Sequence, residues 1–340
     1  MKTISKLLML SVLFAFIFVT SCKKDDSEPA VNEAQVLVEY LESANSPLMK
    51  DFVSTDMPTI MPASDVKTLN TTSQVYIIDI RSAADYAAGH IANAHNVALA
   101  DILTHIEGVN LTSYTKVAIV CYTGQTAGFA ASLLRIMGYD KVYSMKWGMC
   151  AWNTFFAGRW NTAAITNGNS QAANFVTTET AKGPMGELPT LATGMKTGQE
   201  ILEERVNALL AEGFTPASVT NATVFGGLTS YYIVNYWPAA QYSDALLGHI
   251  PGAIQYTPKE SLKLAVDLKT LPTNKTIAVY CYTGQTSAFL AAYLRLLGYD
   301  AKSILYGTNG MIYDKMVAKT GMTVFNAAQI MEYDYVSSTK

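Results

Sequence analysis

Apolar residues along this chain follow two patterns: short runs rich in β-branched residues, and longer stretches whose apolar positions recur at helical spacing. The short runs predict buried strands, and the longer stretches predict helices that pack on a sheet. Because the two patterns alternate, they indicate a parallel sheet covered by helices. The predicted strands are residues 75–80, 116–120, 231–234 and 276–280, and the predicted helices are residues 33–43, 127–137, 198–211 and 287–297.

This order of elements occurs twice along the chain. Cys121 returns 160 positions later as Cys281, and the heptapeptide at 134–140 returns with two substitutions at 294–300. A repeat of this length is a whole domain rather than a solenoid unit. A Gly-His-Ile triplet is repeated as well, as Gly89-His90-Ile91 and Gly248-His249-Ile250.

The chain length of 340 residues also suits two domains, since a single core rarely grows beyond about 250–300 residues. We predict a first domain at 33–160 and a second at 197–340. Residues 161–196 are rich in Thr, Ala, Gly and Asn and have no sustained period, so we predict that they form a linker.

An identical hexapeptide, Cys-Tyr-Thr-Gly-Gln-Thr, lies between a predicted strand and a predicted helix in each domain. This position brings a cysteine sulfur close to the unpaired amides and the positive dipole end of the helix. Such a cysteine can have a pKa below that of a free thiol and act as a nucleophile. The alternative is that Cys121 and Cys281 are small buried residues at strand ends. The candidate substrate-binding residues are Tyr122, Thr123, Gly124, Gln125, Thr126, Tyr282, Thr283, Gly284, Gln285 and Thr286.

The N-terminal residues form a pattern of their own. Two lysines precede an apolar run at 7–19, which is too short for a comfortable membrane span and typical of an export signal. The Val-Thr-Ser-Cys string that ends at Cys22 resembles the lipobox of bacterial lipoproteins, where lipid is attached to the cysteine. We predict a signal peptide at 1–21, lipidation of Cys22 and a polar tether at 22–32.

The polar run after Cys22 resembles surface-export signals of Bacteroidetes lipoproteins. The resemblance implies a protein of the cell envelope, anchored by lipid to the outer membrane and either periplasmic or surface-exposed. The net charge of −3 gives no indication of nucleic-acid binding. With Cys22 assigned to lipid, three cysteines remain, and this odd number favours free thiols over a disulfide framework.

The motifs of the first domain together resemble the rhodanese family of sulfurtransferases, and the whole chain resembles its tandem members. The resemblance rests on Asp79-Ile80-Arg81, on residues 85–96, on the cysteine loop and on the Gly-rich turn at 147–152. It implies an α/β fold of two tandem rhodanese-like domains, each a central parallel sheet flanked by helices. It also assigns structural roles to Asp79, Arg81, His90 and His249.

Two departures from the family pattern stand out. The second domain has Asn235 and Trp237 where the first has Asp79 and Arg81, which puts its geometry in question. In addition, both loops end in threonine, whereas many thiosulfate-using rhodaneses place a cationic residue there. The resemblance therefore supports sulfur transfer as the reaction more strongly than it supports thiosulfate as the donor.

The resemblance implies a sulfurtransferase that forms a cysteine persulfide on Cys121 or Cys281 and needs no metal or organic cofactor. The expected partners are a small sulfur donor, a thiol or cyanide-like acceptor and, through the lipid, a membrane. Cysteine phosphatases need an arginine six positions after the nucleophile, where this chain has Ala127 and Ser287. Two alternatives stay open: a non-catalytic module that binds anions or a partner protein, and a thiol redox protein outside the cytoplasm.

Three further residues have both a structural and a chemical interpretation. His90 and His249 could act as bases, but a hydrogen bond that fixes the turn is the favoured role. Cys150 could resolve a persulfide on Cys121, although a buried cysteine without chemistry is favoured. No pair of histidines or cysteines has metal-ligand spacing, so we expect no metal site.

Overall fold

The computed structural model describes residues 32–338, which belong to one compact unit. The predicted signal peptide at 1–21, the predicted lipidation site Cys22 and the tether up to residue 31 lie outside the described residues. Within residues 32–338, no helix is both long and apolar enough to cross a membrane.

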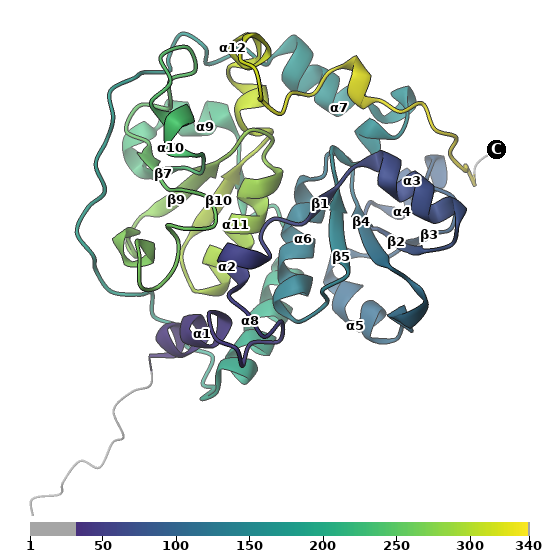
Figure 1. The fold of residues 1–340 in the computed structure, drawn as a ribbon, viewed down its shortest axis with the longest axis horizontal. Coiled ribbons are helices and arrows are strands. Elements are labelled where there is room, and N and C mark those ends of the chain that lie inside the picture. Colours follow the sequence, from purple (N-terminus) through teal and green to yellow (C-terminus); the bar gives the residue numbers. More distant parts are fainter. Residues whose placement is uncertain (1–31, 339–340) are drawn as a thin grey trace, which may run out of the picture. The chain divides into compact units, whose positions relative to one another are not determined.

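The chain forms two five-stranded sheets, one in each half, and every strand pair within them is parallel (Figure 1). Their strand orders, β1-β5-β4-β2-β3 and β6-β10-β9-β7-β8, match strand for strand. The predicted fold class is therefore confirmed. The strands of the first sheet are β1 (Ile60–Met61), β2 (Val75–Asp79), β3 (Ala94–Asn96), β4 (Lys116–Val120) and β5 (Val142–Met145). Those of the second are β6 (Ser218–Val219), β7 (Tyr231–Asn235), β8 (Ile254–Gln255), β9 (Thr276–Tyr280) and β10 (Ala301–Ile304).

Helices cover both sheets, and the two that follow the cysteine loops, α6 and α11, pack against each other between them (Figure 1). Gly128 of α6 allows a close approach, because a Cβ there would lie 3.1 Å from the carbonyl oxygen of Gln285. Ser132 donates a hydrogen bond to the carbonyl of Phe289 across the same contact. The helices are α1 (Glu33–Leu41), α2 (Phe52–Thr55), α3 (Ala63–Thr71), α4 (Ala83–Ala88), α5 (Ile102–Glu107), α6 (Gln125–Ile136), α7 (Gly158–Trp160), α8 (Gly198–Glu212), α9 (Asn221–Gly226), α10 (Ala239–Tyr242), α11 (Gln285–Leu296) and α12 (Tyr313–Ala318).

After the last strand of each domain, the chain continues as a segment, here called an arm, that pairs with the other domain through Val176 or Val336. Val176, beyond the first sheet, exchanges two backbone hydrogen bonds with His249 of the second domain. Val336, near the C-terminus, does the same with His90 of the first domain. The two bridges join equivalent positions of the internal repeat, so each domain pairs with the other through the same backbone hydrogen bonds.

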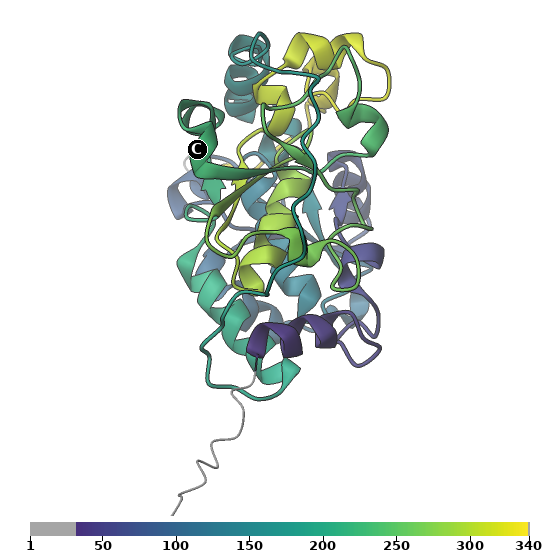
Figure 2. The same ribbon diagram turned by 90° about the vertical axis from the view of Figure 1, so that its left-hand side faces the viewer.

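Residues 161–196, which we predict to be a linker from their composition, are ordered and lie along the second domain. They begin with a π-helical turn (Asn161–Thr166), and Figure 2 shows the later part running lengthwise over the second domain. Leu188 is buried, and Gly186 donates a hydrogen bond to the carbonyl of Lys269. The segment is held by backbone pairing and a few apolar contacts rather than by a periodic apolar face, so its composition gives no sign of these contacts.

The second domain keeps its sheet without the Asp79–Arg81 pair. Asn235, at the end of β7, donates a hydrogen bond of 2.7 Å to the hydroxyl of Tyr280 on the neighbouring strand. Trp237 is fully buried and packs edge-on against the same ring. A neutral hydrogen bond and an indole thus stand in the place of a buried ion pair, and the strand order of the sheet is kept.

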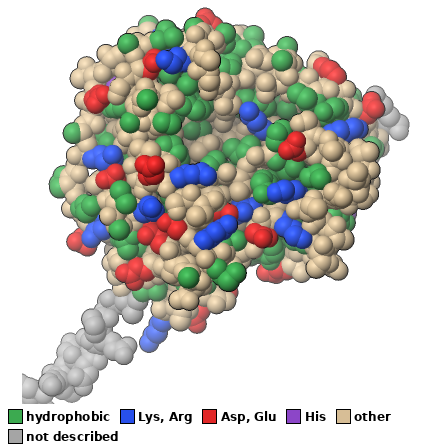
Figure 3. All heavy atoms as spheres, in the orientation of Figure 1, with side chains coloured by type: hydrophobic (Ala, Val, Ile, Leu, Met, Phe, Trp, Pro, Cys, Tyr) green, Lys and Arg blue, Asp and Glu red, His purple; other side chains and the backbone are tan. Residues whose placement is uncertain are grey.

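Charged side chains on the face shown in Figure 3 are scattered, and the two signs are intermixed. This face carries no broad basic surface, in agreement with the small net charge.

Candidate active site

Each cysteine lies between the end of a central strand and the start of a helix. β4 ends at Val120, and α6 begins at Gln125 after Gly124, whose φ of +84° is in the left-handed region. Glycine adopts this conformation without strain, which lets the chain turn sharply from strand to helix. Gly284 has the same role in the second loop with a φ of +76°.

The loops turn backbone N–H groups toward the sulfur atoms. Cys121 Sγ accepts hydrogen bonds from the amides of Gly124 at 3.1 Å and Ala127 at 3.3 Å. Cys281 Sγ accepts one from the amide of Ser287 at 3.3 Å. Donors at a helix N-terminus stabilise negative charge, so both sites are suited to a thiolate or a persulfide anion.

Cys281 also has a hydroxyl neighbour that the first site lacks. Its thiol lies 3.5 Å from the hydroxyl of Ser287, which is hydrogen-bonded at 2.7 Å to that of Ser303. Ser303 in turn donates to the carbonyl of Gly284 in the loop. The first domain has Ala127 in place of Ser287. From the sequence, Ser287 is considered only as a residue that cannot bind phosphate as arginine does. Its contact with Cys281 forms only when the loop folds and brings the two side chains together.

A Gly-rich turn closes over each loop and holds its carbonyl groups. The amides of Met149 and Cys150 donate to the carbonyls of Cys121 at 2.8 Å and Tyr122 at 3.1 Å. Gly148 makes this contact possible, because a Cβ there would lie 2.5 Å from the carbonyl carbon of Tyr122. Because the loop carbonyls are hydrogen-bonded to the closing turn, they point away from the sulfur, and the loop amides point toward it.

The two loops are joined to each other by their glutamines. Gln125 accepts a hydrogen bond of 2.7 Å from the amide of Tyr306 in the second domain's closing turn. Gln285 accepts one of 3.0 Å from the amide of Trp147 in the first domain's turn, and its amide group contacts the carbonyl of Gly124. Both side chains are buried and bridge the domains, and Gln285 also borders a cavity, so substrate binding by the two glutamines stays a prediction.

Both sulfur atoms lie deep in the protein, since Cys121 is 5% exposed and Cys281 is 3% exposed. Burial raises the pKa of the Cys121 thiol, because the thiolate is deprived of water. The amides of Ala127, Thr123 and Gly124 offset part of this rise. The expectation of a lowered pKa is therefore wrong for Cys121 in this conformation, because desolvation outweighs the amides.

We expect the alkylation of Cys121 by iodoacetamide to accelerate about tenfold per pH unit between about pH 7 and pH 9, because the thiolate is the reactive form and its pKa is raised. Mass spectrometry of the peptide containing Cys121 gives the rate at each pH. Free cysteine, with a pKa of about 8.5, provides the reference and should begin to level off first. A rate at Cys121 that levels off near neutral pH would contradict the raised pKa.

Aromatic side chains enclose the first loop. Trp160 is fully buried, and its indole N–H donates to the carbonyl of Thr123 at 3.1 Å. Its ring contacts those of Trp147, Tyr306 and Phe325, which come from three other segments. The arm that carries Phe325 comes from the second domain, so the cover of the Cys121 site needs both halves of the chain.

Charged groups beside the first loop form a stack around Tyr122. The guanidinium groups of Arg81 and Arg159 lie 5.1 and 3.8 Å from the centre of its ring. Its hydroxyl donates to Asp85, and this hydrogen bond lowers the pKa of the Asp85 carboxyl. Arg81 pairs with Asp79 at 2.6 Å, and both side chains are 1% exposed.

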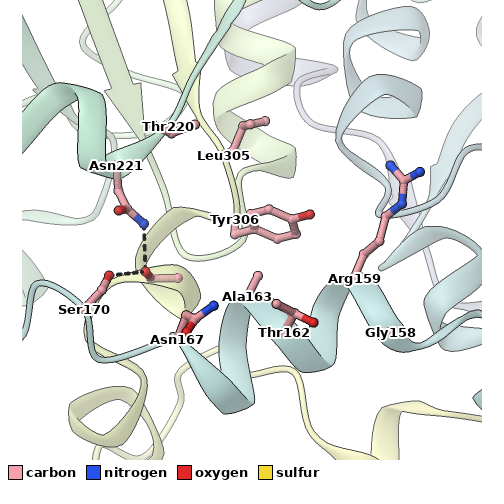
Figure 4. Close-up of a pocket in the computed structure, with 11 residues that line it drawn as sticks. Gly158, Arg159, Thr162, Ala163, Asn167, Ser170, Thr220, Asn221, Leu305 and Tyr306 are labelled. Carbon is pink, nitrogen blue, oxygen red and sulfur yellow. Dashed lines mark hydrogen bonds between the residues drawn. The ribbon is translucent and has the colours of Figure 1, made fainter.

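Two cavities lie at equivalent places on the two domains. The larger, of about 560 Å³, is lined by Gly158, Arg159, Thr162, Ala163, Asn167, Ser170, Thr220, Asn221, Leu305, Tyr306 and Gly310 (Figure 4). The smaller, of about 330 Å³, is lined by Ile60, Pro62, Lys146, Tyr282, Thr283, Gln285, Thr286 and Thr323. Only the smaller cavity is bordered by residues of a cysteine loop, that of Cys281. Of the ten residues predicted to bind substrate, four border the smaller cavity, and the other six line neither: Tyr122, Thr123, Gly124, Gln125, Thr126 and Gly284.

The remaining predicted residues have mainly structural contacts. His90 and His249 hydrogen-bond through Nδ1 with the carbonyls of Tyr86 and Tyr242 at 2.8 and 3.1 Å. Cys150 is fully buried, and burial raises its pKa to about 11. Among residues 32–338 the cysteines are unpaired, and no group of three or more His, Cys, Asp or Glu side chains could hold a metal ion.

Two parallel sheets, each with a cysteine loop at the end of a central strand, define a tandem α/β protein with two thiol sites hydrogen-bonded by backbone amides. The chain belongs to the Rhodanese-like domain family, whose sequence profile matches residues 62–154 and 233–311.

The chain resembles several known proteins. It is 36% identical over 95 residues to "Thiosulfate sulfurtransferase GlpE" of Pseudomonas fluorescens (strain SBW25), covering 28% of this chain and 81% of that protein. The protein of the same name from Pseudomonas putida (strain GB-1) is 32% identical over 96 residues, covering 28% and 86%. The crystal structure of SseA from Escherichia coli, a 3-mercaptopyruvate sulfotransferase, is 18% identical, and the match covers 74% of this chain and 98% of that chain with a TM-score of 0.26.

Proposed function

We propose that this protein is a sulfurtransferase that carries a sulfane sulfur as a persulfide on Cys121 and Cys281. The observation that carries the proposal is the hydrogen bonding of each sulfur by backbone amides at the start of a helix. Membership of the rhodanese-like family and the likeness to thiosulfate sulfurtransferases support the same reaction.

The proposed reaction has two steps. The thiolate attacks the outer sulfur of thiosulfate or of a persulfide, and the bond to sulfite or to the thiolate leaving group breaks with its electron pair. The enzyme then holds Cys–S–S⁻, whose negative charge the loop amides stabilise. A thiol or cyanide-like acceptor attacks the terminal sulfur, and the cysteine leaves as the thiolate. The steps balance without a metal, an oxidant or an organic cofactor.

Intact mass after incubation with thiosulfate or with a low-molecular-weight persulfide tests this function. We expect the wild-type protein to gain sulfur, and we expect Cys121→Ser and Cys281→Ser each to lose the gain at one site. Cys150→Ser, which removes a buried thiol outside the loops, is the matched control and should gain sulfur as the wild type does. No gain from any donor would support a binding module instead, and cysteine–cysteine links on oxidation would support a redox role.

We also propose that the protein is exported and anchored to the outer membrane through lipid on Cys22, in the periplasm or at the surface. The apolar run at 7–19 and the lipobox-like string support this location. Cys22→Ser should move the protein from the membrane fraction to the soluble fraction of cells that express the full chain, because one anchor is removed. An unchanged membrane fraction would contradict lipid anchoring at this residue.

A further inference from the structure

The cavity beside the second loop has one charged group, and that group comes from the first domain. Lys146 follows β5 of the first sheet, while Tyr282, Thr283, Gln285 and Thr286 belong to the loop and helix start beside Cys281. The other lining residues carry hydroxyl, carboxamide or apolar groups, and none is acidic. The cavity therefore has an unopposed positive charge, surrounded by hydrogen-bonding groups.

The ammonium group of Lys146 has no anionic partner in the described part of the chain. No carboxylate lies within ion-pair distance of the Lys146 Nζ. The Nζ lies over the ring of Trp147, 5.3 Å from the ring centre. Burial lowers the pKa of Lys146, because the charged form is partly deprived of water. Lys146 also borders a neighbouring cavity whose other lysine, Lys319, is paired with Asp244. An anion bound beside Lys146 would compensate a charge that the protein leaves unpaired.

The internal repeat provides a direct comparison, because Leu305 occupies the position of Lys146 in the second domain. The amide of Lys146 bonds to Met61 at the end of β1, and the amide of Leu305 bonds to Val219 at the end of β6. Each residue precedes a closing-turn residue with positive φ, Trp147 or Tyr306. The two domains thus present a lysine and a leucine at the same point of the fold.

The larger cavity, which Leu305 lines, has a different charge distribution. Its one cation, Arg159, is stacked on Tyr122, and its charge acts on Asp85, whose pKa it helps to lower. Figure 4 shows the guanidinium of Arg159 turned away from Asn167, Ser170 and Asn221. The larger cavity therefore lacks a free cation of the kind that Lys146 provides to the smaller one.

We propose that Lys146 binds the oxyanion group of a small sulfur donor of the thiosulfate or thiosulfonate class, and so makes the Cys281 site the one that accepts sulfur from such donors. The inference rests on the sulfurtransferase function proposed above. Lys146 holds the donor by its negatively charged oxygens while the Cys281 thiolate attacks the sulfane sulfur. The sulfur–sulfur bond breaks and the oxyanion leaves as sulfite or sulfinate with the electron pair. Lys146 thereby supplies, from the other domain, the cation that Thr286 does not.

The test measures sulfur uptake at Cys281, by mass spectrometry of its peptide, as a function of thiosulfate concentration. We expect Lys146→Met to raise the half-saturating concentration about tenfold or more, because a charge-assisted contact is lost. Lys146→Arg should restore most of the affinity, which a purely structural role for the lysine stem would not predict. Uptake from an alkyl persulfide without an oxyanion group should be the same in all three proteins, and this shows that Cys281 and its loop are intact.

Leu305→Lys places a lysine at the equivalent position of the repeat, beside the larger cavity, which no residue of the second loop lines. We expect thiosulfate affinity at Cys281 to be unchanged in this variant, which serves as the matched charge control. Equal thiosulfate affinity in the wild type and Lys146→Met, or no uptake from thiosulfate at Cys281 while the alkyl persulfide still loads it, would overturn the inference and leave the proposed function standing. No uptake from any donor would overturn both.

Discussion

Gly148→Ala should reduce sulfur uptake at Cys121 by about 100-fold or more, in line with the loss of one backbone donor from an anion-binding site. A Cβ at this position would lie 2.5 Å from the carbonyl carbon of Tyr122 and 2.6 Å from the amide nitrogen of Gly124, and closer still to the carbonyl oxygen of Cys121. These atoms are backbone, so the loop itself has to move. The amides would then leave the sulfur, and the persulfide would lose its stabilisation.

Gly307→Ala is the equivalent change in the second domain and should have the same effect on Cys281. A Cβ there would lie 2.7 Å from the amide nitrogens of both Thr283 and Gly284. Gly183→Ala is the control, because a Cβ at that position has no neighbour within 4 Å. Peptide mass spectrometry after incubation with donor measures uptake at each cysteine. Normal uptake at Cys121 in Gly148→Ala would show that the amide arrangement is not needed.

Arg81→Met should lower the free energy of unfolding by about 3–5 kcal/mol, because it leaves the Asp79 carboxylate buried without a counter-charge. The guanidinium makes hydrogen bonds of 2.6–3.1 Å to that carboxylate and one of 2.7 Å to the carbonyl of Gly89. Urea unfolding followed by tryptophan fluorescence measures the loss. Lys319→Met is the control, since the Lys319–Asp244 pair is partly exposed and should contribute less than about 1 kcal/mol.

The double variant Asp79→Asn, Arg81→Met should lose much less stability than Arg81→Met alone, because no uncompensated charge remains in the interior. The second domain keeps the strand order with the neutral Asn235 in the place of Asp79, although Asn235 there bonds to Tyr280, where the first domain has Val120. If the single and double variants unfold at the same urea concentration, the buried charge is not the cause of the loss.

The two thiol sites have the same backbone but different surroundings. The loop of Cys121 is covered by Trp160, whose ring contacts that of Phe325 from the C-terminal arm, and both of these side chains are fully buried. Cys281 has Ser287 beside its sulfur and lies on a loop that borders the cavity lined by Lys146. A duplicated domain has thus acquired two chemical environments, and the Gln125 and Gln285 bridges join their loops.

The core elements could be predicted because a parallel sheet buries its strands on both faces. The runs at 116–120 and 276–280 are the whole of β4 and β9, with the bounds that their apolar residues predict. The helices after the loops begin two residues earlier than predicted, at Gln125 and Gln285. The turn at the preceding glycine already completes the change of direction, so polar loop residues form the first helical turn.

The amino-acid sequence alone determined the repeat, two central strands of each sheet (β2 and β4, β7 and β9), the helices that follow the cysteine loops, and the placing of two cysteines at strand–helix turns, because these depend on local patterns that repeat within each half. Tertiary structure alone decided the exchange of arms, the crossed glutamines, the raised pKa of Cys121 and the position of Lys146 beside the other domain's loop. These features depend on contacts between residues far apart in the chain. The burial of a side chain and the charges around it depend on the residues that pack against it, and local sequence patterns do not predict which residues these are.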